Sequence, residues 1–343
     1  MSRAANPPAR KAGPTMHAFA RVAAGFTAVA LVAAACSSST TGGSSATPTA
    51  TATASAGSGG IDLAAIPLGD GHYSTTTPAV GTLYICNEFA EGGGADTDGP
   101  WIHGDTWNLH EKAVVEGDVK WPDASYDDAV SGDTRSAKTN DLPNDHTTGI
   151  FPIASSDPAY QYDRNPNSIT AQDFAWELPA KPEEASTPTC LPAEVGIMKS
   201  GVVLLNALDA KNRDAVAHEV QDHCDGHPQT SGVYHYHSVS DCLEDSGSGH
   251  SALVGYAFDG FGIYGNRGEN GESLTNADLD ECHGHKHSVE WDGADTNIYH
   301  YHSTYEFPYT VGCFKGTPIS SNNFAGEGGG AGQGPGGGPP PGR

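Results

Sequence analysis

Residues 232–242 of the 343-residue chain read GVYHYHSVSDC, and residues 297–313 read NIYHYHSTYEFPYTVGC. Both segments contain the tetrapeptide Tyr-His-Tyr-His, followed by a serine and, further on, by a cysteine. Successive side chains of a β-strand point to opposite faces of the sheet. We therefore expect His235 and His237 to share one face of a strand and the two tyrosines to share the other. The second copy repeats the arrangement.

The repeat extends beyond the tetrapeptide. Residues 222–227 (DHCDGH) and 280–285 (DECHGH) both read D-x-C-x-G-H. The last histidine of this motif precedes the tetrapeptide by 7 residues in the first copy and by 14 in the second. The following cysteine comes 5 and 11 residues after the tetrapeptide. The second unit is thus the first with two loop insertions, and the chain contains a pseudo-duplicated C-x-G-H/YHYH unit.

The first 60 residues differ in composition from the rest, since they contain no Asp or Glu. Four basic residues precede an apolar run at residues 22–35, which is too short to span a bilayer and is typical of a signal peptide. The sequence Ala33-Ala34-Ala35-Cys36 resembles the lipobox of bacterial lipoproteins, which implies a lipid on Cys36 and a position on the outer face of the cell membrane. The predicted organisation is a lipoprotein signal peptide (1–35), a lipidated Cys with a flexible Ser/Thr/Ala linker (36–60), a folded domain (61–325) and a disordered Gly/Pro tail (326–343).

Charge excludes one class of partner. The 17 Lys+Arg less the four in the leader leave 13 against 42 Asp+Glu, a formal charge of −29 for the processed chain. Nucleic-acid phosphates require a field of the opposite sign. The expected partners are the membrane, through the lipid, and cations.

Six cysteines remain once Cys36 is assigned to the lipid, and an oxidising compartment favours disulfides over free thiolates. If the two units are structurally equivalent, each closes its own bridge, and the last pair follows by elimination. The predicted disulfides are Cys224–Cys242, Cys282–Cys313 and Cys86–Cys190.

Short β-rich segments alternate with turns along the folded region. Residues 81–86, 195–206 and 253–264 read as strands, with turns at residues 199–201 and 259–260; residues 112–121 read as a hairpin and residues 212–222 as a helix of two to three turns. We predict a mainly β protein with sparse short helices, forming a single disulfide-stapled domain.

Several motifs together resemble a known family, the YHYH domain, which is named for the tetrapeptide and has no agreed biochemical function. They are NDHTTGIFP at 144–152, NPNSI at 165–169, VGYAFDGFGIY at 254–264, FPYTVGCFKG at 307–316, and both copies of the repeated unit. The resemblance covers roughly residues 144–316. It implies a family and leaves the activity to be argued from the residues.

The density of histidines suggests a metal, because 11 of the 16 lie between His218 and His302. Two imidazoles at i and i+2 can share an ion, and four would meet if the two tetrapeptide strands were neighbours. Sites rich in imidazole suit copper or zinc. The candidate ligands are His235, His237, His300, His302, His227, His285 and His146.

Three alternatives stay open. Tyrosines and histidines can form a metal-free hydrogen-bond network in a structural or interaction module of the cell envelope. An extracellular His- or metal-dependent enzyme of unknown substrate would use imidazoles as acid and base, with Asp259 and Asp280 as further candidates. Calcium is the weaker cofactor candidate, at residues 96–99 and 266–278. His218, His283 and His287 are expected at the surface or in solvent. His103 and His110 lie outside the segment that resembles the family.

Overall fold

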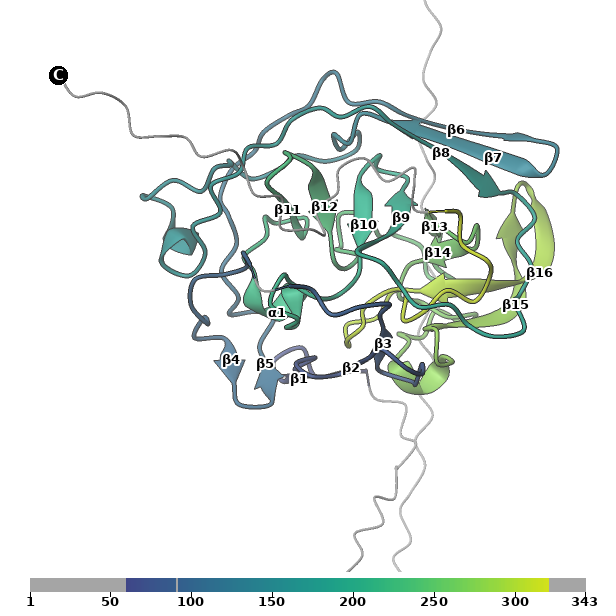
Figure 1. Cartoon of the computed structure of the whole chain (residues 1–343), viewed down its shortest axis with the longest axis horizontal. Helices are drawn as coiled ribbons and strands as arrows, with labels where there is room; N and C mark the ends of the chain where they lie inside the picture. Colours follow the sequence, from purple (N-terminus) through teal and green to yellow (C-terminus); the bar gives the residue numbers. More distant parts are fainter. Residues whose placement is uncertain (1–59, 91, 321–343) are drawn as a thin grey trace, which may run out of the picture. The chain divides into compact units, whose positions relative to one another are not determined.

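Eight short strands, β9 to β16, form the largest sheet, in the order β11-β12-β10-β9-β13-β14-β16-β15 (Figure 1). The computed structural model describes residues 60–90 and 92–320. The predicted signal peptide, the predicted lipidation site Cys36 and the predicted Gly/Pro tail lie outside these residues. The eight strands are β9 (Glu194–Met198), β10 (Val203–Leu205), β11 (Gly226–Pro228), β12 (Tyr234–Tyr236), β13 (Leu253–Ala257), β14 (Gly262–Tyr264), β15 (Gly284–Trp291) and β16 (Ala294–His302).

The large sheet consists of two equivalent halves. In each half an antiparallel hairpin (β9–β10 or β13–β14) is followed by a crossover to a parallel strand (β12 or β16), which also pairs with an antiparallel edge strand (β11 or β15). The halves meet at the antiparallel pair β9–β13, where Ile197 lies opposite Tyr256. A pseudo-twofold axis perpendicular to the sheet therefore relates the halves and keeps equivalent side chains on the same face.

Three smaller sheets and three short helices complete the described residues. One sheet has the order β1-β5-β4, one contains β2 and β3, and one has the order β6-β7-β8. Their bounds are β1 (Ile66–Pro67), β2 (Tyr73–Ser74), β3 (Leu83–Tyr84), β4 (Ile102–His103), β5 (Thr106–Trp107), β6 (Tyr126–Ser131), β7 (Thr134–Thr139) and β8 (Phe174–Pro179), and the helices are η1 (Pro158–Gln161), α1 (Ala215–His218) and η2 (Asn276–Asp278). The mainly β class with sparse helices is confirmed.

Two local predictions were wrong, for one reason. Residues 112–121 do not form a hairpin, because Val115 bridges to Asp222 and Val119 to Thr148, both distant in sequence. The predicted helix at 212–222 is a single turn, α1, capped at its start by the Asp214 carboxylate. It ends at Glu219, whose backbone is extended, and the Val115 amide binds the carbonyl of Gln221. In both places tertiary pairing replaces the local preference.

Disulfides connect the chain as the repeat predicts. Cys224 pairs with Cys242, Cys282 with Cys313, and Cys86 with Cys190. The first two bridges each lie within one unit, and they tie the D-x-C-x-G-H motif to the segment after the tetrapeptide. Residues 60–90 and 92–320 include no helix with both the length and the apolar character needed to cross a bilayer.

Candidate metal centres

The tetrapeptide divides its four side chains between the two faces of the sheet. Pairing within each unit places the motif histidine opposite the first tetrapeptide histidine, His227 opposite His235 and His285 opposite His300. The tyrosines point to the opposite face. Tyr234, Tyr236 and Tyr301 are fully buried there. Each half of the tetrapeptide therefore has its own surroundings and can be assigned its own role.

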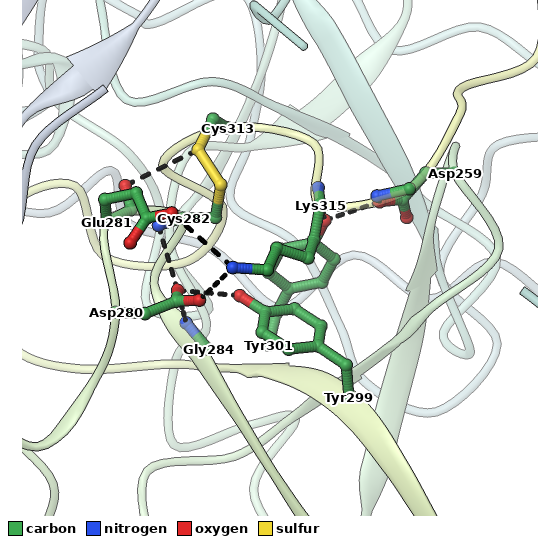
Figure 2. The surroundings of a disulfide bond; sticks show 10 residues. Asp259, Asp280, Glu281, Cys282, Gly284, Tyr299, Tyr301, Cys313 and Lys315 are labelled. Carbon is green, nitrogen blue, oxygen red and sulfur yellow. Dashed lines mark hydrogen bonds and ion pairs between the residues drawn. A yellow bond between two sulfur atoms is a disulfide. The ribbon is translucent and has the colours of Figure 1, made fainter. Parts of the chain in front are cut away.

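The tyrosine hydroxyls are satisfied by hydrogen bonds within the protein. Tyr299 donates to Asp280 Oδ1 at 2.8 Å and Tyr301 donates to Asp259 Oδ2 at 2.5 Å (Figure 2). The Lys315 amide donates to the Tyr301 hydroxyl at 2.7 Å. In the first unit Tyr234 donates to Asp222 Oδ2 at 2.8 Å. The tyrosine half of the tetrapeptide thus holds turns together.

The same aspartates organise the motif turns. Asp222 Oδ1 accepts from the amides of Cys224 and Gly226, as Asp280 Oδ1 does from those of Cys282 and Gly284. Burial raises the pKa of Asp222 and also that of Asp259. Asp259 and Asp280 were candidates for acid–base chemistry. Their carboxyls accept hydrogen bonds from tyrosines and from backbone amides, so we assign them a structural role.

The first histidine cluster consists of His227, His235 and His237. A ligand atom from each lies within 4.8 Å of those of the other two, and all three side chains are buried. His235 Nδ1 contacts the Val233 carbonyl at 3.2 Å, and His237 Nδ1 contacts that of Asn206 at 2.5 Å. A carbonyl oxygen only accepts, so each Nδ1 carries the proton and each Nε2 presents a lone pair. Metal-binding histidines are oriented in this way by backbone carbonyls.

Glu219 adds a carboxylate to the first cluster. Its Oε2 lies 3.5 Å from His227 Nε2 and 3.6 Å from His237 Nε2. Burial raises the pKa of Glu219 well above its usual range, and the charges of Asp209 and Asp163 act in the same direction. Glu219 Oε2 and both nitrogens of His227 are buried and have no hydrogen-bond partner among the described residues.

The second cluster contains five histidines, His250, His285, His287, His300 and His302, whose ligand atoms all lie within 4.8 Å of one another. His300 Nδ1 contacts the Ile298 carbonyl at 3.0 Å, and His302 Nδ1 contacts that of Gly265 at 2.6 Å. These two carbonyls are equivalent to those that contact His235 and His237 in the first unit. His250 Nδ1 contacts the Ser251 carbonyl at 2.8 Å. The Nε2 atoms of these three are buried and unpartnered in the described part of the chain.

Burial favours the neutral form of four cluster histidines, His235, His237, His285 and His300. It lowers the pKa of His235 to about 3, with a contribution from the charge of His237, and that of His237 to about 4. Burial likewise lowers the pKa of His300 to about 3 and that of His285 to about 4, the latter also through neighbouring histidines. Neutral imidazoles with inward lone pairs are the form in which histidine binds metals.

The two clusters are separate. Strands β10, β9, β13 and β14 lie between the tetrapeptide strands β12 and β16 (Figure 1). The two tetrapeptide strands are thus not neighbours, and their four imidazoles do not meet at one site. Each pair instead joins the motif histidine of its own unit, so that the pseudo-twofold axis generates two sites.

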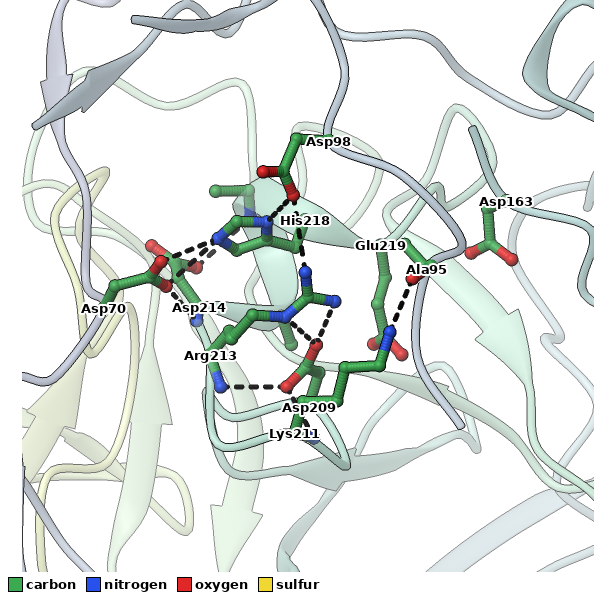
Figure 3. Close-up of polar contacts among 12 residues, drawn as sticks. Asp70, Ala95, Asp98, Asp163, Asp209, Lys211, Arg213, Asp214, His218 and Glu219 are labelled. Carbon is green, nitrogen blue, oxygen red and sulfur yellow. Dashed lines mark hydrogen bonds and ion pairs between the residues drawn. The ribbon is translucent and has the colours of Figure 1, made fainter. Parts of the chain in front are cut away.

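Several histidines lie elsewhere than expected. His146 contacts the Asp145 carboxylate at 2.6 Å and the Tyr236 hydroxyl at 3.1 Å, on the tyrosine side of the sheet rather than in a cluster. His218 is buried, and both its nitrogens contact carboxylates, those of Asp98 and Asp70 (Figure 3). His283 is also buried, so neither is a solvated residue.

Asp98, part of the candidate calcium segment at 96–99, is used by His218 and by Arg213, whose Nη1 lies 3.4 Å from Asp98 Oδ1. Its carboxylate thus has an arginine and a histidine of the protein beside it. A third grouping, of His223 with Cys224 and Cys242, has no thiolate to offer because the two cysteines form a disulfide.

Three residues in or beside the clusters were not among the predicted candidates. His287 lies two residues after His285 on β15, so strand alternation, which was applied to the tetrapeptide, would have placed it on the same face. His250 and Glu219 come from a loop and from the end of α1, and no spacing in the sequence indicates them.

Comparison with known proteins gives one match. No curated protein and no solved structure matches the chain. A family model matches one segment of the chain, which is shorter than the resemblance at residues 144–316. This segment includes the first unit and the β13–β14 hairpin of the second half of the sheet, and it ends before β15. A family model described as YHYH protein matches residues 175–276, which identifies this segment as a YHYH domain.

Proposed function

We propose that the protein binds two transition-metal ions, one at the histidine cluster of each unit. The observation that carries the proposal is the set of buried nitrogens without partners, His300 Nε2 and His302 Nε2 in one unit and both nitrogens of His227 in the other. A buried polar atom without a hydrogen bond costs about 1–3 kcal/mol. Several such atoms converging on one point are explained by a cation that binds all of them.

Copper and zinc are the ions that suit these ligands. Both clusters consist mainly of imidazole, and six of the seven cysteines are in disulfides and offer no thiolate. Imidazole suits copper, zinc, nickel and iron, and intrinsic affinity among divalent ions is highest for copper. The backbone carbonyls that orient the Nδ1 atoms supply the outer shell that such sites require.

The alternative of a metal-free Tyr/His network accounts for only half of the tetrapeptide. The tyrosines form that network, because their hydroxyls bind aspartates and backbone amides. The histidines satisfy one nitrogen each through the backbone and leave the other toward the cluster. We therefore assign the tyrosines to the scaffold and the histidines to the ion.

The setting that we propose is the outer face of the membrane, with the domain anchored by a lipid on Cys36. Three disulfides agree with an oxidising compartment. The role there would be to sequester or deliver the metal.

Metal analysis of purified protein refolded with trace copper and zinc tests the proposal. Wild type should retain two ions per chain after dialysis, and His235→Ala/His237→Ala and His300→Ala/His302→Ala should each retain one. His103→Ala/His110→Ala is the matched control, since both residues are exposed and outside the clusters. A folded wild-type protein that retains no metal, with variants that lose only stability, would favour the scaffold alternative.

A further inference from the structure

The two units differ at the cluster residues that lie outside the repeated motif. Three residues before the motif aspartate, the first unit has Glu219 and the second has Ala277. Two residues after the motif histidine, the first unit has Gln229 and the second has His287. The second cluster also receives His250. The first cluster therefore contains three imidazoles and a carboxylate, and the second contains five imidazoles.

We infer that Glu219 is a metal ligand and completes a closed zinc site with His227, His235 and His237. This inference rests on the proposed function, because it assigns the ligand set of one of the two sites. It goes beyond the histidine pattern, which by itself treats the two units alike.

The distances from Glu219 to His227 and His237 fit ligands of one ion better than they fit a hydrogen bond. Its Oε2 lies 3.5 and 3.6 Å from two Nε2 atoms, beyond a normal hydrogen bond. Two ligand atoms that are each about 2.1 Å from a tetrahedral zinc ion lie about 3.4 Å apart. In Figure 3 the Glu219 carboxyl has no dashed contact with the residues drawn, and its Oε2 has no hydrogen-bond partner among all the residues described.

The end of α1 places Glu219 beside the first cluster. The helix α1 stops after one turn, and Glu219 at its C-terminal end has φ −83° and ψ 150°. This extended conformation carries the side chain inward, where it is 8% exposed. An unpaired buried carboxylate is strongly unfavourable unless a cation compensates it.

Burial and ligand number distinguish the two sites further. All members of the first site are buried, whereas His250, His285 and His287 of the second are partly exposed. Four-ligand zinc sites that are closed to solvent are typically structural. A carboxylate also makes the ligand set harder, which favours Zn²⁺ over Cu⁺. The first site is thus the one that retains zinc, and the second is the one open to exchange.

Glu219→Gln tests the inference in purified protein, with zinc affinity measured by competition against a chelator. His300→Ala/His302→Ala serves as the background, so that only the first site is observed. Because outer-shell changes already cost 10–100-fold, loss of a ligand should weaken Zn²⁺ binding by at least about tenfold. Glu116→Gln, the same change at an exposed position, should have no effect.

Unchanged zinc affinity in Glu219→Gln, with zinc still lost in His235→Ala/His237→Ala, would overturn the role of Glu219 and leave the proposed function intact. Absence of any metal from the first site of wild type would overturn both, whereas copper without zinc there would overturn only the zinc assignment. If a variant does not fold, a structure of zinc-loaded wild type decides: Glu219 Oε2 should lie about 2.0–2.2 Å from the ion. Zinc bound by the three histidines with Glu219 outside bonding distance would refute the inference.

Discussion

Acid should destabilise the metal-free protein through its buried histidines, and His235→Gln isolates the effect. The pKa of His235 is about 3 in the folded protein, because of burial and of the charge of His237, against about 6.5 when unfolded. Below pH 6.5, His235 therefore binds a proton in the unfolded chain but stays neutral in the folded protein. Stability is full above pH 6.5 and falls as the pH is lowered toward the folded pKa.

The magnitude follows from the two pKa values. At pH 5 one such histidine costs about 2 kcal/mol of unfolding free energy relative to pH 7.5. Buried carboxyls with raised pKa values, such as that of Asp163, act in the opposite direction. They are common to wild type and variant, so they cancel when the variant is compared with wild type.

Urea unfolding of chelator-treated protein, followed by circular dichroism between pH 7.5 and 5, measures the difference. The stability of His235→Gln relative to wild type should rise by about 2 kcal/mol on acidification over this range. The matched control is His72→Gln, because His72 is exposed. A pH-independent difference for His235→Gln would refute the conclusion that the cluster holds neutral, desolvated imidazoles.

Three further predictions concern the scaffold. Cys282→Ser/Cys313→Ser opens a bridge with a sequence separation of 31 and should lower the unfolding free energy by about 3.7 kcal/mol in chemical denaturation. Tyr301→Phe removes one buried and one partly buried hydrogen bond and should cost about 2 kcal/mol, whereas Tyr73→Phe, whose hydroxyl has no hydrogen bond with described residues, should be near neutral; equal costs would contradict the assignment. Gly226→Ala should lower the melting temperature, because its Cβ would overlap the ring of the first tetrapeptide tyrosine; an unchanged melting curve would show that the turn can move.

The sequence predicts the parts of the site that depend on strand alternation and on the repeat. Alternation places His235 with His237 and His300 with His302, and the structure has both pairs. The repeat predicts the disulfides Cys224–Cys242 and Cys282–Cys313 because equivalent units close equivalent loops. Both inferences use contacts within one unit, where the chain is short between the residues concerned.

Strand order and loop contributions could not be predicted in the same way. The four strands between β12 and β16 result from pairing of the two hairpins at β9–β13, a contact between units that no local pattern specifies. Glu219 reaches its cluster only because α1 ends early, and this end depends on pairing with Val115. His250 arrives on a loop. Tertiary contacts decide each of these positions.

The measurement that most directly tests the central claim, two separate metal sites on one sheet, is the distance between two Cu²⁺ ions in one chain by pulsed dipolar electron paramagnetic resonance. Copper exceeds zinc in intrinsic affinity and should fill both sites. Six inter-strand steps of about 4.8 Å separate the midpoint of β11 and β12 from that of β15 and β16, which predicts a distance of about 29 Å. A single copper per chain, or two ions coupled at contact distance, would contradict the account.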